Sequence, residues 1–118
     1  MAQYKHLPIY KSTYDLLEKV TIITKNFPKD FKYTLGAKLR EEVVDLVIYI
    51  FKANSSRSNK KEFVEKVLER MQVVELLLRL SKDMRLMTIK HFSEVVVLSD
   101  SVGRQAQGWI NALSSQAE

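Results

Sequence analysis

Residues that break helices are scarce in this chain, and their positions divide it into four segments. Its 118 residues include three glycines and two prolines. Pro8 opens the first segment and Pro28 closes it, because proline is tolerated in the first turn of a helix and disrupts a helix interior. The polar run at residues 54–59 and a weaker break at residues 84–88 separate the other segments. Each segment is long enough to form a helix.

Apolar residues recur at steps of three and four in all four segments, which is the spacing of one face of an α-helix. The sequence predicts helices at about residues 8–26, 34–53, 60–83 and 89–113. Residues 43–51 are rich in the β-branched side chains that are typical of strands. However, apolar and polar residues alternate poorly in this segment, and its charged residues fall mostly away from the apolar face of a helix. We therefore expect a deeply buried helix.

Four amphipathic helices joined by short connections are typical of an antiparallel up-down-up-down four-helix bundle. We therefore predict an all-α fold in a single domain that spans residues 1–118. Thr34 and Thr88 are the expected N-caps of two helices. Asn59 and Glu62 have the spacing of a capping box at the start of a third helix.

The composition is that of an ordinary globular protein, with 46% apolar and 28% charged residues. The absence of cysteine from the sequence excludes disulfides and thiolate metal sites. No apolar run reaches the roughly 18 residues of a membrane-spanning helix, and the first fifteen residues lack the apolar run of a signal peptide. We expect a cytoplasmic protein that makes no membrane contact.

The sequence offers little catalytic or metal-binding chemistry. Its two histidines, His6 and His91, lack the Glu three residues earlier that di-iron bundles use as a ligand. No phosphate-binding glycine loop, zinc-protease motif or serine-hydrolase motif occurs. Glu94 lies three residues after His91, a spacing that predicts a surface pair. We therefore expect a protein that is not an enzyme and that holds no metal or cofactor.

Other acidic residues are expected to pair locally on exposed helix faces. Glu41, Glu42 and Asp45 are predicted to form a solvated face that balances neighbouring bases. Arg104 is expected to pair with Asp100, which lies four residues earlier.

The net charge of +5 is distributed unevenly along the chain. Residues 25–40 and 79–90 together hold nine Lys or Arg against two Asp, a net charge of +7, whereas the rest of the chain is net −2. In an antiparallel bundle these two segments meet at one end. We predict that this end binds nucleic acid through its phosphates. The candidate contact residues are Lys25, Lys29, Lys32, Lys38, Arg40, Arg79, Lys82, Arg85 and Lys90.

Two further features bear on this prediction. Phe31 and Tyr33 lie among the bases, where their rings are suited to stacking on unpaired nucleotides. A purely structural interpretation also exists, because the helix dipole favours Lys and Arg at helix C-termini. It accounts for three of the nine residues and fails for those near predicted helix N-termini, which are Lys38, Arg40 and Lys90.

Short motifs near the helix ends give the chain a resemblance to a known family. They are Phe27-Pro28-Lys29, Leu35-Gly36, Gly103-Arg104 and Gly108-Trp109-Ile110. With its four-helix length and basic charge, nearly the whole chain resembles the accessory variability determinant (Avd) family of diversity-generating retroelements. It is similar, more distantly, to four-helix proteins encoded in intervening sequences of ribosomal RNA genes. Those relatives typically have an Asn-Ile-Ala-Glu-Gly-like stretch where residues 50–54 read Ile-Phe-Lys-Ala-Asn, which favours the Avd side.

The resemblance implies a non-catalytic accessory subunit. Avd-like proteins form a barrel-shaped homopentamer and bind the retroelement's reverse transcriptase and nucleic acid. They are required for mutagenic retrohoming, in which template RNA is copied into adenine-mutagenised cDNA that replaces a variable region of a target gene. The expected partners are therefore a reverse transcriptase, RNA or DNA, and further copies of this chain. The alternative is a structural oligomeric adaptor of the ribosomal intervening-sequence type, whose positive charge has no role with nucleic acid.

The sequence also predicts where two further groups of residues lie on the protein surface. Some of the apolar or aromatic residues off the main stripes are expected to lie between subunits of an oligomer. The residues off the stripes include Tyr10, Tyr14, Ile22 and Leu98. A second basic cluster at the opposite end of the bundle, Arg57, Lys60 and Lys61, is expected to be a solvated loop.

Overall fold

The computed structural model describes residues 6–117 of the chain. It contains four long helices, α1 (Pro8–Lys25), α3 (Leu35–Ser55), α4 (Lys60–Asp83) and α5 (Ile89–Ala117), and one short helix, α2 (Lys29–Lys32). No strand occurs among these residues, so the all-α prediction is confirmed. The predicted domain also includes residues 1–5 and 118, which lie outside the described residues.

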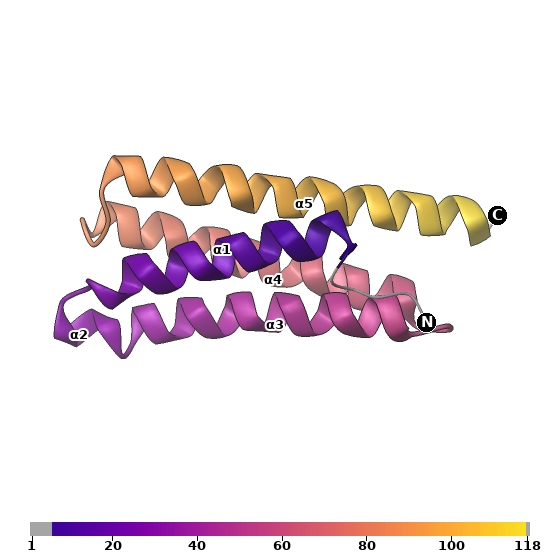
Figure 1. Ribbon diagram of the computed structural model, residues 1–118, viewed down its shortest axis with the longest axis horizontal. Helices are drawn as coiled ribbons and strands as arrows, with labels where there is room; N and C mark the ends of the chain where they lie inside the picture. The colour runs from indigo at the N-terminus through magenta and orange to yellow at the C-terminus, as the bar shows by residue number, and fades with distance from the viewer. Residues whose placement is uncertain (1–5, 118) are drawn as a thin grey trace.

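The long helices form an antiparallel up-down-up-down bundle, as predicted (Figure 1). α1 packs against α3 and α5, and α4 packs against the same two helices. Each long helix therefore has two neighbours that run in the opposite direction to it. The bundle measures 48 × 21 × 20 Å along its principal axes. Because only short connections join the helices, segments far apart in the sequence meet at each end.

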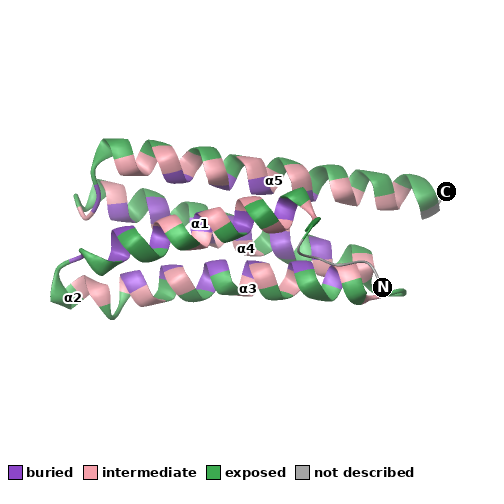
Figure 2. Cartoon of the chain, in the orientation of Figure 1, coloured by how far each residue is buried: buried purple, intermediate pink, exposed green. Residues whose placement is uncertain are grey.

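The core is a column of aliphatic side chains enclosed by the four long helices. Figure 2 shows the buried positions as recurring bands along each helix, separated by exposed ones. Leu16, Leu46, Val74 and Val102, one from each long helix, have no exposed surface. Burial of one such side chain contributes about 1.5–3 kcal/mol relative to its exposure. The apolar stripe of each helix therefore holds the bundle together.

The β-branched segment at residues 43–51 is helical, as predicted, and lies within α3. The expectation that this helix is deeply buried is correct for one face only, on which Val43 and Leu46 are fully buried. On the other face, Val44 and Ile48 are 41% and 43% exposed. This difference follows the helical period, because residues three or four apart share a face and adjacent residues do not.

The helix boundaries differ from the predicted ones around Pro28 and at the C-terminal end. α1 ends at Lys25, one residue early, and α2 has no counterpart among the predicted helices. The Phe31 and Lys32 amides donate to the Pro28 carbonyl, each at 2.8 Å, so Pro28 begins a new turn after the first helix has ended. A single turn is too short to show an apolar period in the sequence. α5 continues to Ala117, beyond the predicted end at residue 113.

The predicted N-caps are confirmed at one of three positions. The Thr88 hydroxyl accepts a hydrogen bond from the backbone amide three residues later, at 3.0 Å. Thr34 does not cap α3, because its hydroxyl donates to the Asp30 carbonyl at 2.8 Å. Asn59 does not cap α4 with its side chain, and its backbone amide donates to the Ser56 hydroxyl at 2.9 Å. The Thr34 hydroxyl is thus occupied by the preceding turn. At Asn59, Ser56 takes the backbone amide that Glu62 would bind in a capping box.

Candidate nucleic-acid interface

The end of the bundle that includes α2 brings the two basic segments together. At this end α1 and α4 finish, and α3 and α5 begin (Figure 1). A shallow pocket lined by both Asn26 and Arg85 shows that the two segments are neighbours in space. We call residues 25–40 and 79–90, taken together, the basic end. The juxtaposition that the bundle topology predicts is therefore present.

Five of the nine predicted contact residues are exposed at the basic end and make no ion pair within residues 6–117. They are Lys25, Lys29, Arg79, Arg85 and Lys90. An exposed cation that has no carboxylate partner is available to a phosphate without first breaking an internal contact. These five residues make up the part of the basic end that is best suited to an anionic ligand.

Two more of the nine, Lys32 and Lys82, are half-buried and lie over aromatic rings. Lys32 Nζ is 5.6 Å from the centre of the Tyr33 ring, and Lys82 Nζ is 4.9 Å from the centre of the Phe92 ring. Lys82 Nζ also lies 3.7 Å from the Asp83 carboxylate. A cation–π contact orients an ammonium group without neutralising its charge. Lys32 therefore still adds to the positive potential of this end, whereas Asp83 offsets part of the charge of Lys82.

The two aromatic residues expected to stack on nucleotides are placed differently. Tyr33 is 66% exposed, so its ring is available to a base. Phe31 is half-buried and packs against the apolar core, where it anchors α2 to the bundle. Only Tyr33 is therefore placed to stack on a nucleotide.

Arg40, another of the nine, is engaged within the bundle. Its Nη1 donates to the Thr24 hydroxyl at 2.7 Å, and its Nη2 donates to the Lys32 carbonyl at 3.4 Å. The half-buried guanidinium thus joins the start of α3 to the end of α1 and to α2. Arg40 therefore stabilises the packing of α1, α2 and α3 at the basic end.

Glu42 is buried, so the prediction that it belongs to a solvated face is wrong. Its side chain is 2% exposed, with Lys38 Nζ at 2.9 Å and Arg70 Nη1 at 3.2 Å. A carboxylate removed from water needs such partners, because desolvation disfavours its charged form. The hydrogen bond to Glu42 and its charge raise the pKa of Lys38. A hydrogen bond to Glu69 and the charge of Glu42 raise the pKa of Arg70.

Arg85 holds a left-handed backbone conformation at the end of α4, with a φ of 60°. The Arg85 amide donates to the Lys82 carbonyl, and the Leu86 amide donates to the Ser81 carbonyl, both at 2.9 Å. This pair of bonds is the Schellman motif, in which glycine is the usual residue at the left-handed position. A side chain there costs about 1–2 kcal/mol. An exposed arginine therefore stands where the backbone alone would favour glycine.

Two local pairs expected from the sequence do not form. Glu94 binds Lys19 of α1, with Oε2 and Nζ 2.8 Å apart, rather than His91. The Lys19 hydrogen bond lowers the pKa of Glu94. Asp100 and Arg104 make no ion pair with each other or with any other described residue. In the case of Glu94, a cross-helix contact replaces the predicted local one.

The part of the chain that the structure describes shows neither a metal cluster nor a membrane span. No three His, Asp or Glu residues within it are grouped so that they could hold a metal ion. None of its helices combines the length and apolar character needed to traverse a bilayer.

The helix arrangement and the sequence agree with one known family. Residues 7–113 match the bAvd-like family. The chain belongs to this family. The match confirms the resemblance to Avd proteins, and it places the chain among accessory proteins. Among curated proteins, none matches this sequence.

One feature of this bAvd-like bundle that sequence reasoning missed is the buried ion cluster around Glu42. A signal was present, because Glu42 lies three residues after Leu39 and four before Leu46, and both leucines are fully buried. Glu42 therefore belongs to the apolar stripe of its helix. Its partner Arg70 has no comparable signal, because 28 residues separate the two in the sequence.

Proposed function

We propose that this bAvd-like protein is a non-catalytic accessory subunit of a diversity-generating retroelement and that its basic end binds the template RNA or the cDNA. The observation that carries the proposal is a group of five exposed cations at one end of the bundle, none of which forms an ion pair with a residue that the structure describes. Such residues bind phosphates, release counterions and do not read the base sequence. Membership in the bAvd-like family supports the accessory role.

In this proposal the reverse transcriptase is the protein partner and supplies the chemistry of cDNA synthesis. The four-helix protein binds the nucleic acid and keeps it close to the polymerase during mutagenic retrohoming. Co-purification of the chain with the reverse transcriptase of a diversity-generating retroelement tests this partner directly. We expect a complex that survives RNase treatment, and failure to recover one from purified components would remove the polymerase from the proposal.

Self-association into a homopentamer is part of the same proposal, and exposed apolar residues on adjacent helices support it. Tyr14 and Ile22 on α1 are 50% and 56% exposed, and Val97 on α5 is 67% exposed. Tyr10 and Leu98, also expected between subunits, already pack against the core of the protomer. A ring of copies would repeat the basic end and turn weak phosphate contacts into avidity. Light scattering tests this point, and a monomer mass at micromolar concentration would exclude it.

The nucleic-acid role is tested by RNA binding across a salt series with two charge-matched variants. The test variant removes three charges from the basic end: Lys29→Gln, Arg85→Gln and Lys90→Gln. The control removes three exposed charges elsewhere: Arg57→Gln, Lys61→Gln and Lys66→Gln. We expect the test variant to bind single-stranded RNA at least tenfold more weakly. Its salt slope should fall by about two, because each phosphate contact on a single strand contributes about 0.7.

The outcomes separate the proposal from its alternative. An equal loss in both variants would mean that total charge, and not the basic end, determines binding. An unchanged affinity and salt slope in the test variant would show that this end is not the nucleic-acid surface. A wild-type protein that forms oligomers but binds no RNA at low salt would favour the structural adaptor. Oligomer mass and helical content are measured in parallel, so that misfolding is not mistaken for lost binding.

A further inference from the structure

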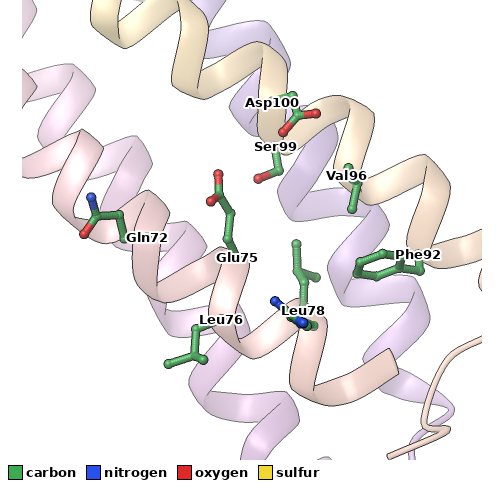
Figure 3. A pocket seen from close by; sticks show the side chains of 9 residues that line it. Gln72, Glu75, Leu76, Leu78, Phe92, Val96, Ser99 and Asp100 are labelled. Carbon is green, nitrogen blue, oxygen red and sulfur yellow. The ribbon is translucent and has the colours of Figure 1, made fainter. Parts of the chain in front are cut away.

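A pocket between α4 and α5 contains polar groups that the fold does not use. Its volume is about 410 Å³, and its walls include Glu75 of α4 and Ser99 and Asp100 of α5. Figure 3 shows the Glu75 and Asp100 carboxylates and the Ser99 hydroxyl around the same opening. A volume of this size falls within the range of small-ligand sites.

Ser99 is the first observation that points to a ligand. The residue is 1% exposed, and its hydroxyl has no hydrogen-bond partner in the described structure. Other buried hydroxyls of the bundle behave differently: those of Thr13 and Thr24 on α1 and of Ser81 on α4 donate to the carbonyl four residues earlier, at 2.7–2.8 Å. A buried polar group that lacks a partner destabilises the fold. Ser99 lines the pocket, where a bound group that reaches its hydroxyl would supply the missing partner.

The charges around the pocket provide the second observation. Glu75 and Asp100 form no ion pair with any residue in the described part of the chain, although the protein has a net charge of +5. Arg79 also lines the pocket, so its three charged residues sum to −1. Two carboxylates and a hydroxyl accept hydrogen bonds from a group that has several N–H donors. The pocket is therefore complementary to a cation.

The remaining walls favour an organic cation over a metal ion. Leu78 and Val96 line the same pocket and offer an apolar surface to methylene groups. No cluster of three acidic or histidine ligands exists within residues 6–117, so the donor set does not suit a divalent metal. We propose that this pocket binds an organic cation, namely an ammonium or guanidinium group on an aliphatic chain. Two sources carry this chemistry, a free amine and the Lys or Arg side chain of a protein.

Arg79 is the one pocket-lining residue that also belongs to the basic end. The test of the proposal uses two probes. Agmatine is a free guanidinium compound, and a blocked Gly-Arg-Gly peptide presents the same group on a polypeptide. Each is titrated into the full chain while the backbone amide signals of α4 and α5 are followed by NMR. We expect saturable shifts around the pocket at concentrations up to about 10 mM. Shifts with the peptide alone would assign the source to a protein side chain, and shifts with agmatine would assign it to a free amine.

Three variants make the proposal falsifiable. Combined Glu75→Gln and Asp100→Asn should weaken binding about tenfold, because hydrogen bonds to charged acceptors are lost. Arg79→Gln should strengthen binding about twofold, because it removes a like charge. Ser99→Ala should weaken binding about threefold and raise the thermal midpoint of the free protein, because it removes an unsatisfied hydroxyl.

A purely structural role for these residues gives the opposite results. The proposal fails if neither probe shifts the α4 and α5 signals, or if the shifts persist in the double variant. It also fails if Ser99→Ala lowers the thermal midpoint, since the hydroxyl would then have a stabilising partner. The double variant retains every residue of the basic end, so its RNA affinity should not fall. That control separates failure of this proposal from failure of the nucleic-acid role.

Discussion

Both ends of the bundle carry clustered cations, but the two ends use them differently. At the end opposite the basic end, Lys60 Nζ donates to the Ala53 carbonyl at 2.7 Å and to the Asn54 carbonyl at 3.3 Å. These carbonyls belong to the last turn of α3, where helical amides no longer supply partners. Lys60 also lies 5.9 Å from the centre of the Trp109 ring. At the basic end, Lys29 is exposed and makes no ion pair with a described residue.

The difference shows that the density of Lys and Arg in a segment does not reveal what the charge does. The expectation of a solvated loop at Arg57, Lys60 and Lys61 is wrong for Lys60, because its ammonium group joins the start of α4 to the end of α3. A cation surrounded by free carbonyls stabilises the fold. A cation that lacks such partners remains available to an external anion.

Gly36, at the basic end, is a tightly packed position and provides the largest expected effect. A Cβ added to Gly36 would lie 3.3 Å from Thr24 Cβ, from the Phe31 carbonyl oxygen and from Arg40 Nη1. Gly36→Val should lower the free energy of unfolding by about 2 kcal/mol, because the start of α3 would be forced away from α1. Gly103→Val is the control, since a Cβ there meets nothing within 4 Å. Urea unfolding measures both, and equal effects would show that the basic end is not more tightly packed.

Lys60→Met tests whether the opposite end depends on its cation for stability. The substitution keeps most of the aliphatic stem and removes the two hydrogen bonds to the end of α3. We expect a loss of about 1.5 kcal/mol in the free energy of unfolding, because hydrogen bonds from charged groups are stronger than neutral ones. Lys61→Met should change stability by less than about 0.5 kcal/mol, since Lys61 is exposed. Similar losses in the two variants would contradict the internal role of Lys60.

The sequence predicts the positions of the long helices well but the contacts of individual polar residues poorly. The stripe that includes Leu16 and Val20 repeats over many turns, so its period is visible locally. Ser99 lies four residues after Val95, within a buried stripe, but nothing local shows that its hydroxyl lacks a partner. Lys60 and its acceptor Ala53 belong to different helices, and their contact depends on how the chain turns between them. Whether the basic end binds nucleic acid stays a prediction.

Arg85→Gly tests whether the basic end retains an arginine at the expense of stability. Glycine adopts a φ of 60° without steric conflict, so the variant should gain about 1 kcal/mol in the free energy of unfolding. The same substitution at Arg79, inside α4, should lose about 1 kcal/mol. Thermal or urea unfolding checks the opposite signs. A loss at Arg85 would mean that its side chain makes a stabilising contact that outweighs the backbone strain.

The smallest expected effect on stability is at Lys19, which already forms an ion pair with a carboxylate. Lys19 Nζ lies 2.8 Å from Glu94 Oε2, and this hydrogen bond lowers the pKa of Glu94. Lys19→Met should return the pKa of Glu94 toward its ordinary value, which NMR titration of the Glu94 carboxyl carbon measures. Lys11→Met is the control, because Lys11 pairs with Asp15 within α1.

The sign of the accompanying pH dependence follows from the lowered pKa of Glu94. A carboxyl group whose pKa is lower in the folded state stabilises the fold above its unfolded pKa and loses that contribution as the pH falls through the folded pKa. Wild type should therefore be slightly more stable than Lys19→Met at neutral pH, and the difference should vanish in acid. A difference that persists in acid would mean that Lys19 stabilises the bundle through its aliphatic packing. Lys19 would then resemble the internally engaged Lys60 more than the unpaired cations of the basic end.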